Sequence, residues 1–396
     1  MTSRLFFSIL AFFLLTLNVN GYGQDRLSAS ARISLLTASP GEELYSVFGH
    51  SALRVVDPEI GLDEVYNYGT FDFDTPNFYL KFSRGQLLYK LSVTSFEYFL
   101  MEYRYEGRAV YEQVLSLTPK EKNRIYEFLL VNRLPENQYY LYDFFYDNCA
   151  TRIRDIVDDH LDPDWGPDPH PEPQRSFRDM LHPYISNTPW IKFGIDLALG
   201  MPSDIKATPW DYMFLPDEMY VAFSQARHAD GRPLVSGQNI VLEETLVRAS
   251  PPALSPSLLL WILFFAGMFS LLKPQLSRWF DRLFFSFLGL LGLVIAFLWF
   301  LSDHAATNQN LNLLWTLPTH LFFVFKASAF NPQGITRLYF RLVFFLNLLF
   351  LMAWLFIPQD FHAAFFPIIL LAMIKAFPYG FGPLTQRFPF LKRTTN

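Results

Sequence analysis

The sequence predicts an α+β extracytoplasmic domain over residues 24–250, followed by an all-α transmembrane domain with five helices over residues 254–377. Three observations lead to this prediction. They are an export signal at the N-terminus, a sharp change in composition near residue 250, and an alternation of basic and non-basic connections between the apolar segments that follow.

The first 23 residues have the pattern of a secretory signal peptide. Arg4 gives a basic start, residues 5–17 form a short apolar stretch, and small residues lead to a plausible cleavage position after Gly23. The alternative is an uncleaved N-terminal anchor. Either form delivers the residues that follow to the outer side of a membrane.

Residues 254–377 contain five long apolar segments, and Ala249–Pro252 is the expected linker before them. A helix of about 20 residues crosses a hydrocarbon core of ~30 Å. The fifth segment is the shortest and contains Pro367 and Lys375. The predicted spans are 254–272, 283–301, 313–330, 338–357 and 361–377.

Lysine and arginine predict the orientation of these spans. The first and third connections and the tail, residues 378–396, contain basic residues, whereas residues 302–312 of the second connection contain none. Basic connections stay in the cytoplasm, so we expect a multi-pass inner-membrane protein with a cytoplasmic C-terminus and an outer 24–250 domain. The net charge of −5 and the absence of a basic stripe argue against a nucleic-acid partner.

The outer domain is predicted to be mixed. Alternating apolar residues predict strands at 33–36, 51–56, 64–68 and within 108–117. Thr118 and Pro119 have the pattern of a helix start, and that helix is expected to continue to Asn132. A second helix is expected from Ala150 to Leu161, and the proline-rich residues 162–174 are expected to form a loop.

Cys149 is the only cysteine of the chain, so it cannot form an internal disulfide. It follows Asn148, a good N-cap, and therefore lies at the start of the second predicted helix. The positive end of that helix, with Arg152 and Arg154 nearby, would favour the thiolate. We interpret Cys149 as a nucleophile; the alternative is a buried, unreactive cysteine.

A cysteine nucleophile needs a base, and His50 is the candidate because it opens a predicted strand after Gly49. Asn67, on the next predicted strand, is the candidate for holding the imidazole, although it could equally be an ordinary edge-strand residue. The Cys149 backbone N–H, with the side chain of Tyr45 or Ser46, is proposed to stabilise an oxyanion.

The histidines lack the spacing of metal ligands, so no metal or cofactor is expected. One connection of the membrane region, residues 302–315, lies on the predicted outer side and is unusually polar. It is either a solvated loop or a polar notch in which His304, Asn308 and Asn312 bind lipid headgroups.

Several segments together resemble a known family. They are Phe48-Gly49-His50-Ser51-Ala52-Leu53-Arg54, Tyr66-Asn67-Tyr68-Gly69-Thr70-Phe71-Asp72-Phe73, Asn77-Phe78-Tyr79-Leu80-Lys81-Phe82 and Tyr142-Asp143-Phe144-Phe145-Tyr146-Asp147-Asn148-Cys149-Ala150-Thr151-Arg152. They resemble the Lnb-type periplasmic domain, and the five apolar segments resemble the membrane part of the same family. The histidine-first, cysteine-later order also resembles circularly permuted papain-like (NlpC/P60-related) thiol enzymes.

The resemblance implies N-acylation of lipoproteins, with a phospholipid as acyl donor, a diacylated lipoprotein as acceptor, and the family's cysteine and histidine at Cys149 and His50. Two other classes stay open. A membrane-tethered cysteine hydrolase, either a phospholipase or a cell-wall amidase, would use the same residues. A non-catalytic envelope scaffold would tolerate the loss of Cys149.

Overall fold

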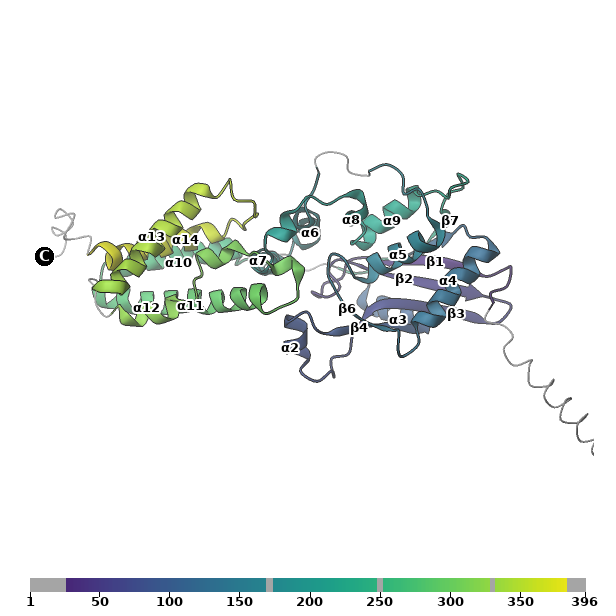
Figure 1. Ribbon diagram of the computed structural model, residues 1–396, viewed down its shortest axis with the longest axis horizontal. Coiled ribbons are helices and arrows are strands. Elements are labelled where there is room, and N and C mark those ends of the chain that lie inside the picture. Colours follow the sequence, from purple (N-terminus) through teal and green to yellow (C-terminus); the bar gives the residue numbers. More distant parts are fainter. Residues whose placement is uncertain (1–25, 169–173, 248–251, 328–331, 383–396) are drawn as a thin grey trace, which may run out of the picture.

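The structure is a computed structural model that describes residues 26–168, 174–247, 252–327 and 332–382. It has two parts that lie end to end: an outer region built around a sheet, and a helical region whose long helices run roughly along the axis of the molecule (Figure 1). The predicted signal peptide, most of the expected linker and the last part of the predicted tail lie outside the described residues.

The outer region contains a seven-stranded antiparallel sheet with the order β6-β4-β3-β2-β1-β5-β7. The three central strands are joined by short connections and are rich in β-branched and apolar residues. The strands are β1 (Arg32–Ala38), β2 (His50–Asp57), β3 (Leu62–Thr70), β4 (Leu88–Ser95), β5 (Val110–Leu115), β6 (Tyr139–Leu141) and β7 (Val235–Leu242).

Helices cover both faces of this sheet. α3 (Phe96–Glu106) packs on one face through Phe99 and Tyr103, and α4 (Pro119–Asn132), α5 (Cys149–Leu161) and α9 (Pro216–Gln225) build the core on the other. The remaining helices of the outer region are α2 (Phe78–Ser83), α6 (Phe177–Ile185), α7 (Pro189–Ala198), the short 3₁₀ helix η1 (Met201–Asp204) and α8 (Pro209–Tyr212).

The predicted elements of the outer region lie where the sequence indicates. The four predicted strands fall on β1, β2, β3 and β5. α4 begins after Thr118, whose side chain accepts a hydrogen bond from the Glu121 backbone N–H, and it ends at Asn132. α5 begins at Cys149 with Asn148 as N-cap and ends at Leu161. Local capping chemistry therefore determines where these two helices begin.

The helical region is built from apolar helices joined by short connections. Among the described residues, α11 and α13 are long and apolar enough to cross a membrane, and α10 and α14 are apolar but shorter. The bounds are α10 (Pro256–Ser270), α11 (Pro274–Phe300), η2 (Ala305–Thr307), η3 (Leu311–Leu314), α12 (His320–Lys326), α13 (Gly334–Ala353) and α14 (Phe365–Phe381).

Two of the predicted spans differ from the structure. The expected helix over 313–330 is instead the single turn η3 followed by α12, because Pro318 interrupts the segment and the chain packs closely on α11. A Cβ at Gly292 would lie 1.9 Å from the Thr316 carbonyl oxygen, so only glycine allows this approach. α11 also begins nine residues before residue 283, and it includes Arg278 and Arg282, which were expected in a connection.

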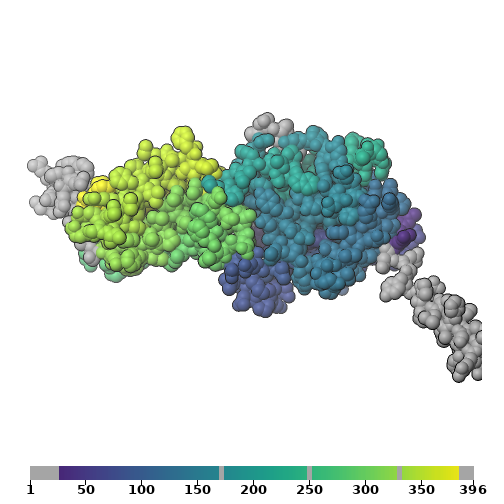
Figure 2. Space-filling model, in the orientation of Figure 1, coloured from purple at the N-terminus to yellow at the C-terminus, as the bar shows by residue number. Residues whose placement is uncertain are grey.

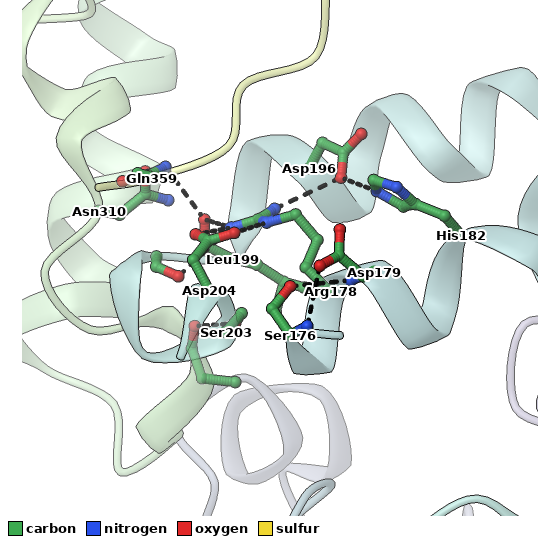
Figure 3. Close-up of polar contacts among 12 residues, drawn as sticks. Ser176, Arg178, Asp179, His182, Asp196, Leu199, Ser203, Asp204, Asn310 and Gln359 are labelled. Atoms are coloured by element: carbon green, nitrogen blue, oxygen red, sulfur yellow. Dashed lines mark hydrogen bonds and ion pairs between the residues drawn. The ribbon is translucent and has the colours of Figure 1, made fainter. Parts of the chain in front are cut away.

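A buried ionic network holds the C-terminal end of α7 in place (Figure 3). Arg178 on α6 is fully buried, with its Nε 2.7 Å from Asp204 Oδ1 and its Nη1 3.3 Å from Asp196 Oδ1. Asp196 also contacts His182 and Lys192, at 2.9 Å and 3.0 Å. These contacts distribute the charges of the network, which burial would otherwise make costly.

The helical region attaches to the same turn of chain. The side-chain amide of Asn310 donates to the Leu197 carbonyl at 2.8 Å. The side-chain amide of Gln359 donates to the Leu199 carbonyl at 3.3 Å (Figure 3). The Gly200 backbone N–H donates to the Ala306 carbonyl at 2.9 Å. The outer region is thus fixed to the connections at one end of the helical region by directional hydrogen bonds as well as by apolar packing.

Candidate active site

Cys149 is the first residue of α5, and its neighbour Asn148 is held from four directions. Asn148 Oδ1 accepts hydrogen bonds from the backbone N–H groups of Ala150 and Thr151, at 2.8 Å and 2.9 Å. Its Nδ2 donates to the carbonyls of Phe144 and Phe214, at 2.8 Å and 2.9 Å. The turn that presents the thiol is therefore rigid, and the thiol lies at the positive end of the helix.

His50 is the first residue of β2 and lies beside the thiol. Gly49 precedes it with φ of +82°, and a Cβ there would lie 3.0 Å from the Ala38 carbonyl, so glycine fits this tight turn best. The His50 Nε2 is 2.5 Å from Asn67 Oδ1 on β3. Because Asn67 engages Nε2, the other ring nitrogen is available to Cys149, and the two side chains are close enough to shift each other's pKa.

The electrostatics of this pair favour its ionised form. Burial alone would raise the pKa of Cys149, but the charge and hydrogen bond of His50, with backbone N–H groups of Ser51 and Ala150, lower the pKa below its ordinary value. Burial likewise lowers the pKa of His50, but Cys149 and Asn67 together raise it above the ordinary value. Both shifts favour transfer of the thiol proton to the imidazole, which the Asn67 amide holds in place.

Gly69 and Tyr140 form the wall of the site beside the thiol. Gly69, with φ of +87°, lies at a register shift of β3; a Cβ at Gly69 would lie 3.5 Å from Cys149 Cβ and 4.0 Å from the Tyr140 hydroxyl oxygen. The Gly69 backbone N–H is directed toward that oxygen. The buried hydroxyl finds no well-placed hydrogen-bond partner among the residues described, so its O–H remains available to donate.

Arg152 fixes the Tyr140 ring rather than the thiolate. Its guanidinium lies 3.7 Å from the centre of that ring and forms two hydrogen bonds to Asp147, at 2.6 Å and 2.8 Å. Arg154 is bonded to Asp155 and lies over Trp210. The two arginines expected to favour the thiolate are thus already paired, and the helix terminus and His50 have that role.

The other predicted site residues lie elsewhere. Tyr45 is 64% exposed, and Ser46 is buried with its hydroxyl donating to the Glu43 carbonyl. No contact of Tyr45 or Ser46 with Cys149 is present in the described part of the chain. Tyr140, which sequence reasoning missed, is the polar side chain that the fold brings to the thiol; its only signal is the dense run of tyrosines at 139, 140 and 142 before the cysteine.

The polar connection after α11 has mainly a structural role. Asn312 is fully buried; its amide donates to the Leu197 carbonyl and its Oδ1 accepts from Trp315 Nε1. The Asn308 backbone lies against Gly200, where a Cβ would be 1.8 Å from the Asn308 carbonyl oxygen. His304 Nε2 is 2.8 Å from the Phe82 carbonyl oxygen. These residues join the two regions, and only His304 is near an exposed apolar surface.

No group of three or more His, Cys, Asp or Glu side chains suited to a metal ion occurs among the residues that the structure describes. The described residues combine an α/β domain, in which Cys149, His50 and Asn67 lie together, with a bundle of apolar helices.

Comparison with family models then identifies the family. Residues 24–182 match the Lnb N-terminal periplasmic domain, and residues 244–381 match the Lnb transmembrane domain. The chain belongs to the Lnb family, and its two matched parts correspond to the outer and helical regions of the structure. No curated protein and no solved structure matches the chain.

Proposed function

We propose that this protein is a membrane-bound lipoprotein N-acyltransferase that moves an acyl chain from phospholipid, through a thioester on Cys149, to the α-amine of a lipoprotein's N-terminal cysteine. The observation that carries the proposal is the placement of Cys149 beside His50, whose imidazole is hydrogen-bonded to Asn67, in a domain fixed to apolar helices. Membership of the Lnb family supports this reaction class.

In the first half-reaction the Cys149 thiolate attacks the carbonyl carbon of a phospholipid ester. A C–S bond forms, and the carbonyl electrons move onto oxygen. When they return, the ester C–O bond breaks, and the His50 imidazolium gives its proton to the leaving alkoxide. The products are a lysophospholipid and an acyl thioester on Cys149.

The oxyanion of this step is stabilised by the Cys149 backbone N–H and the Tyr140 hydroxyl. Burial, followed by the nearby charge of Cys149, raises the pKa of Tyr140 far above its ordinary value, so the phenol remains protonated and can donate. A hydroxyl held in position before the reaction needs no reorganisation when charge develops on the substrate oxygen.

In the second half-reaction the lipoprotein α-amine attacks the thioester. Neutral His50 takes a proton from the amine, a C–N bond forms, and the C–S bond breaks to release the Cys149 thiolate. The amide product leaves and the thiolate–imidazolium pair is restored. Each half-reaction uses the same imidazole in the opposite direction, as a ping-pong mechanism requires.

The orientation of the protein in the membrane follows from which ends of the helices contact the outer region and which carry arginines. The outer region contacts the connections after α11 and α13, whereas Arg278 and Arg282 lie near the other end of α11. Arg341, near the start of α13, donates to the Gly380 carbonyl near the end of α14. The positive-inside rule then supports an inner-membrane protein with a periplasmic N-terminal region and a cytoplasmic C-terminus.

We also propose that the outer region is a circularly permuted papain-like domain. In support, the strand that carries the histidine precedes the helix that carries the cysteine along the chain, and the cysteine opens that helix.

The second candidate function is a hydrolase that shares the first half-reaction and passes the acyl group to water. A phospholipase is the stronger form of this alternative, since a cell-wall amidase needs only one anchor. A partly buried thioester, as Cys149 would carry, favours an amine positioned by the membrane over bulk water.

The test is the reconstituted full chain in phospholipid nanodiscs with a diacylglyceryl-cysteine lipopeptide. Wild-type protein is expected to give the N-acylated peptide and one lysophospholipid per amide. Cys149→Ala is expected to give neither, while the matched variant His160→Ala, at the far end of α5, retains activity. Triacylation by Cys149→Ala would contradict the mechanism, and fatty acid without amide would favour the hydrolase.

A further inference from the structure

The connection between β3 and β4 forms an aromatic protrusion, defined here as residues 71–88. α2, in its middle, has no buried residue, and the side chains of Phe73, Tyr79 and Phe82 are 65%, 81% and 48% exposed. Figure 2 shows the protrusion as a blue lobe that projects from the molecule where its two parts meet. A soluble surface seldom exposes aromatic side chains so closely together.

The aromatic rings of the protrusion pack on one another instead of on the core. Phe73 lies 5.0 Å from Phe71 and 4.9 Å from Phe78, measured between ring centres. Phe78 and Phe82 are stacked at 6.2 Å. The protrusion thus keeps a defined shape while its apolar outer surface remains uncovered by the rest of the described chain.

The protrusion is tied to the helical region directly after the end of α11. The Asp303 backbone N–H donates to the Arg84 carbonyl at 2.8 Å, and Gln86 Nε2 donates to Asp303 Oδ2 at 2.9 Å. His304 Nε2 lies 2.8 Å from the Phe82 carbonyl oxygen. Asp303 and His304 follow the last residue of α11 by only a few positions, so these contacts hold the protrusion level with the end of α11.

α11 lies in the part of the chain that matches the Lnb transmembrane domain, so its end is expected at the membrane surface. α11 is the longest apolar helix that the structure describes, and Phe300 and Leu301 at its end are 64% and 62% exposed. The exposed apolar surface of α11 therefore continues into the aromatic rings held by residues 303 and 304. Aromatic side chains are favoured at this level, where an apolar body meets the polar headgroups.

We propose that the aromatic protrusion inserts into the outer leaflet of the bilayer, at the boundary between headgroups and acyl chains. The protrusion continues β3 beyond Asn67 and Gly69, so the lipid molecules that it contacts lie next to the thiol. This second part of the proposal, the presentation of lipid to Cys149, rests on the function proposed above. The segment has two acidic residues, Asp72 and Asp74, and two basic residues, Lys81 and Arg84, so its charges balance and the attraction is mainly apolar.

The insertion is tested with a spin label, since the chain has a single cysteine to remove. In a Cys149→Ser background, Tyr79→Cys is labelled with a nitroxide in phosphatidylcholine nanodiscs, and its collision rates with oxygen and a water-soluble nickel chelate are measured. The matched control is Ile60→Cys, 53% exposed on the turn at the opposite end of β3.

We expect the label at Tyr79 to collide more with oxygen than with nickel chelate, and the label at Ile60 to show the reverse, at low and high salt alike. A Tyr79 label as accessible to nickel chelate as the Ile60 label would overturn the proposal. The background variant lacks the nucleophile, so this result is independent of acyl transfer.

The lipid-presenting part is tested separately in the protein that retains Cys149. Tyr79→Ser/Leu80→Ser is expected to slow acylation of Cys149 by bilayer phospholipid about tenfold or more, since two large apolar side chains no longer enter the membrane. Alkylation of Cys149 by iodoacetamide should stay unchanged, as should acylation in the control Ile60→Ser. Unchanged acylation in the double variant would contradict this part alone.

Discussion

At the scale of single residues, the site depends on how burial and hydrogen bonding compete at Cys149. Burial opposes a charged thiolate, and the imidazole and backbone N–H groups more than compensate for it. Without His50 the effect of burial would dominate, and Cys149 would be an ordinary buried thiol with a raised pKa.

The first prediction follows from that balance. In wild-type protein the rate of alkylation by iodoacetamide should rise with pH around a midpoint below the ordinary thiol pKa. His50→Ala should move the midpoint above the ordinary value and slow alkylation at pH 7 by at least about tenfold, because burial is no longer opposed. His160→Ala should leave the profile unchanged. Identical profiles for wild type and His50→Ala would show that the two side chains do not interact.

The second prediction concerns the Tyr140 hydroxyl. Tyr140→Phe removes one donor and leaves the ring under Arg152, so the rate of thioester formation should fall by about 10²–10³. The pH profile of alkylation should not change, since the thiolate does not depend on this donor. Tyr139→Phe, on the exposed neighbour, is the matched control. Full activity in Tyr140→Phe would exclude the hydroxyl from the oxyanion site.

At the scale of elements, the helical region is joined by a buried ion pair. Lys375 on α14 has its Nζ 2.9 Å from Asp281 Oδ1 on α11, and the same ammonium donates to Ser270 and Ser277 at 2.6 Å and 2.9 Å. The lysine that made the fifth apolar segment the weakest prediction of a span is therefore a link among three helices. In lipid, such a pair is costly unless all of its members are satisfied.

Removing one member of this ion pair should therefore destabilise the protein more than removing both members. Lys375→Met leaves Asp281 buried and unpaired, and should lower the free energy of unfolding by about 3–5 kcal/mol. Lys375→Met/Asp281→Leu should recover most of that loss. Thermal unfolding in detergent, monitored by circular dichroism, measures both. Equal destabilisation by the single and double variants would mean that the pair does not link the helices.

Local signals in the sequence predicted some elements well and could not predict others. α4 and α5 have complete caps and strong periodicity, so both of their ends could be placed. The prediction of the third span was wrong because apolar composition does not reveal that residues 316–321 pack against Gly289 and Gly292 of α11. Cys149, His50 and Asn67 could be chosen by chemistry and order, whereas Tyr140 could not, because its position depends on the pairing of β6 with β4.

At the scale of the whole molecule, the proposed activity on lipids requires the outer region to stay attached to the helical region. The turn after α7 lies between the Arg178 network and the side-chain amides of Asn310 and Gln359 (Figure 3). Sequence composition placed a boundary near residue 250, but α7 packs on α14 through Phe193 and Phe365, so contact between the regions extends across that boundary.

The attachment of the outer region to the helical region should be sensitive to acid. Burial raises the pKa of Asp196, but hydrogen bonds and charges of His182 and Lys192 lower it to about 2. Because the folded-state pKa is depressed, the carboxylate stabilises the protein above its unfolded pKa of about 4, and the contribution is lost as pH falls toward 2. Thermal unfolding between pH 5 and 2 should show a smaller acid loss in Asp196→Asn than in wild type. Equal acid losses in the two proteins would contradict this role.

The most direct test of the central claim is mass spectrometry of Cys149. Full-length protein in phospholipid nanodiscs, without lipoprotein acceptor, should carry one hydroxylamine-labile acyl group on the peptide that contains Cys149. The group should disappear when a diacylated lipopeptide is added, and should be absent from Cys149→Ala. Formation of N-acylated lipopeptide by Cys149→Ala, or by a wild-type protein that carries no acyl group on Cys149 before the acceptor is added, would contradict the thioester mechanism.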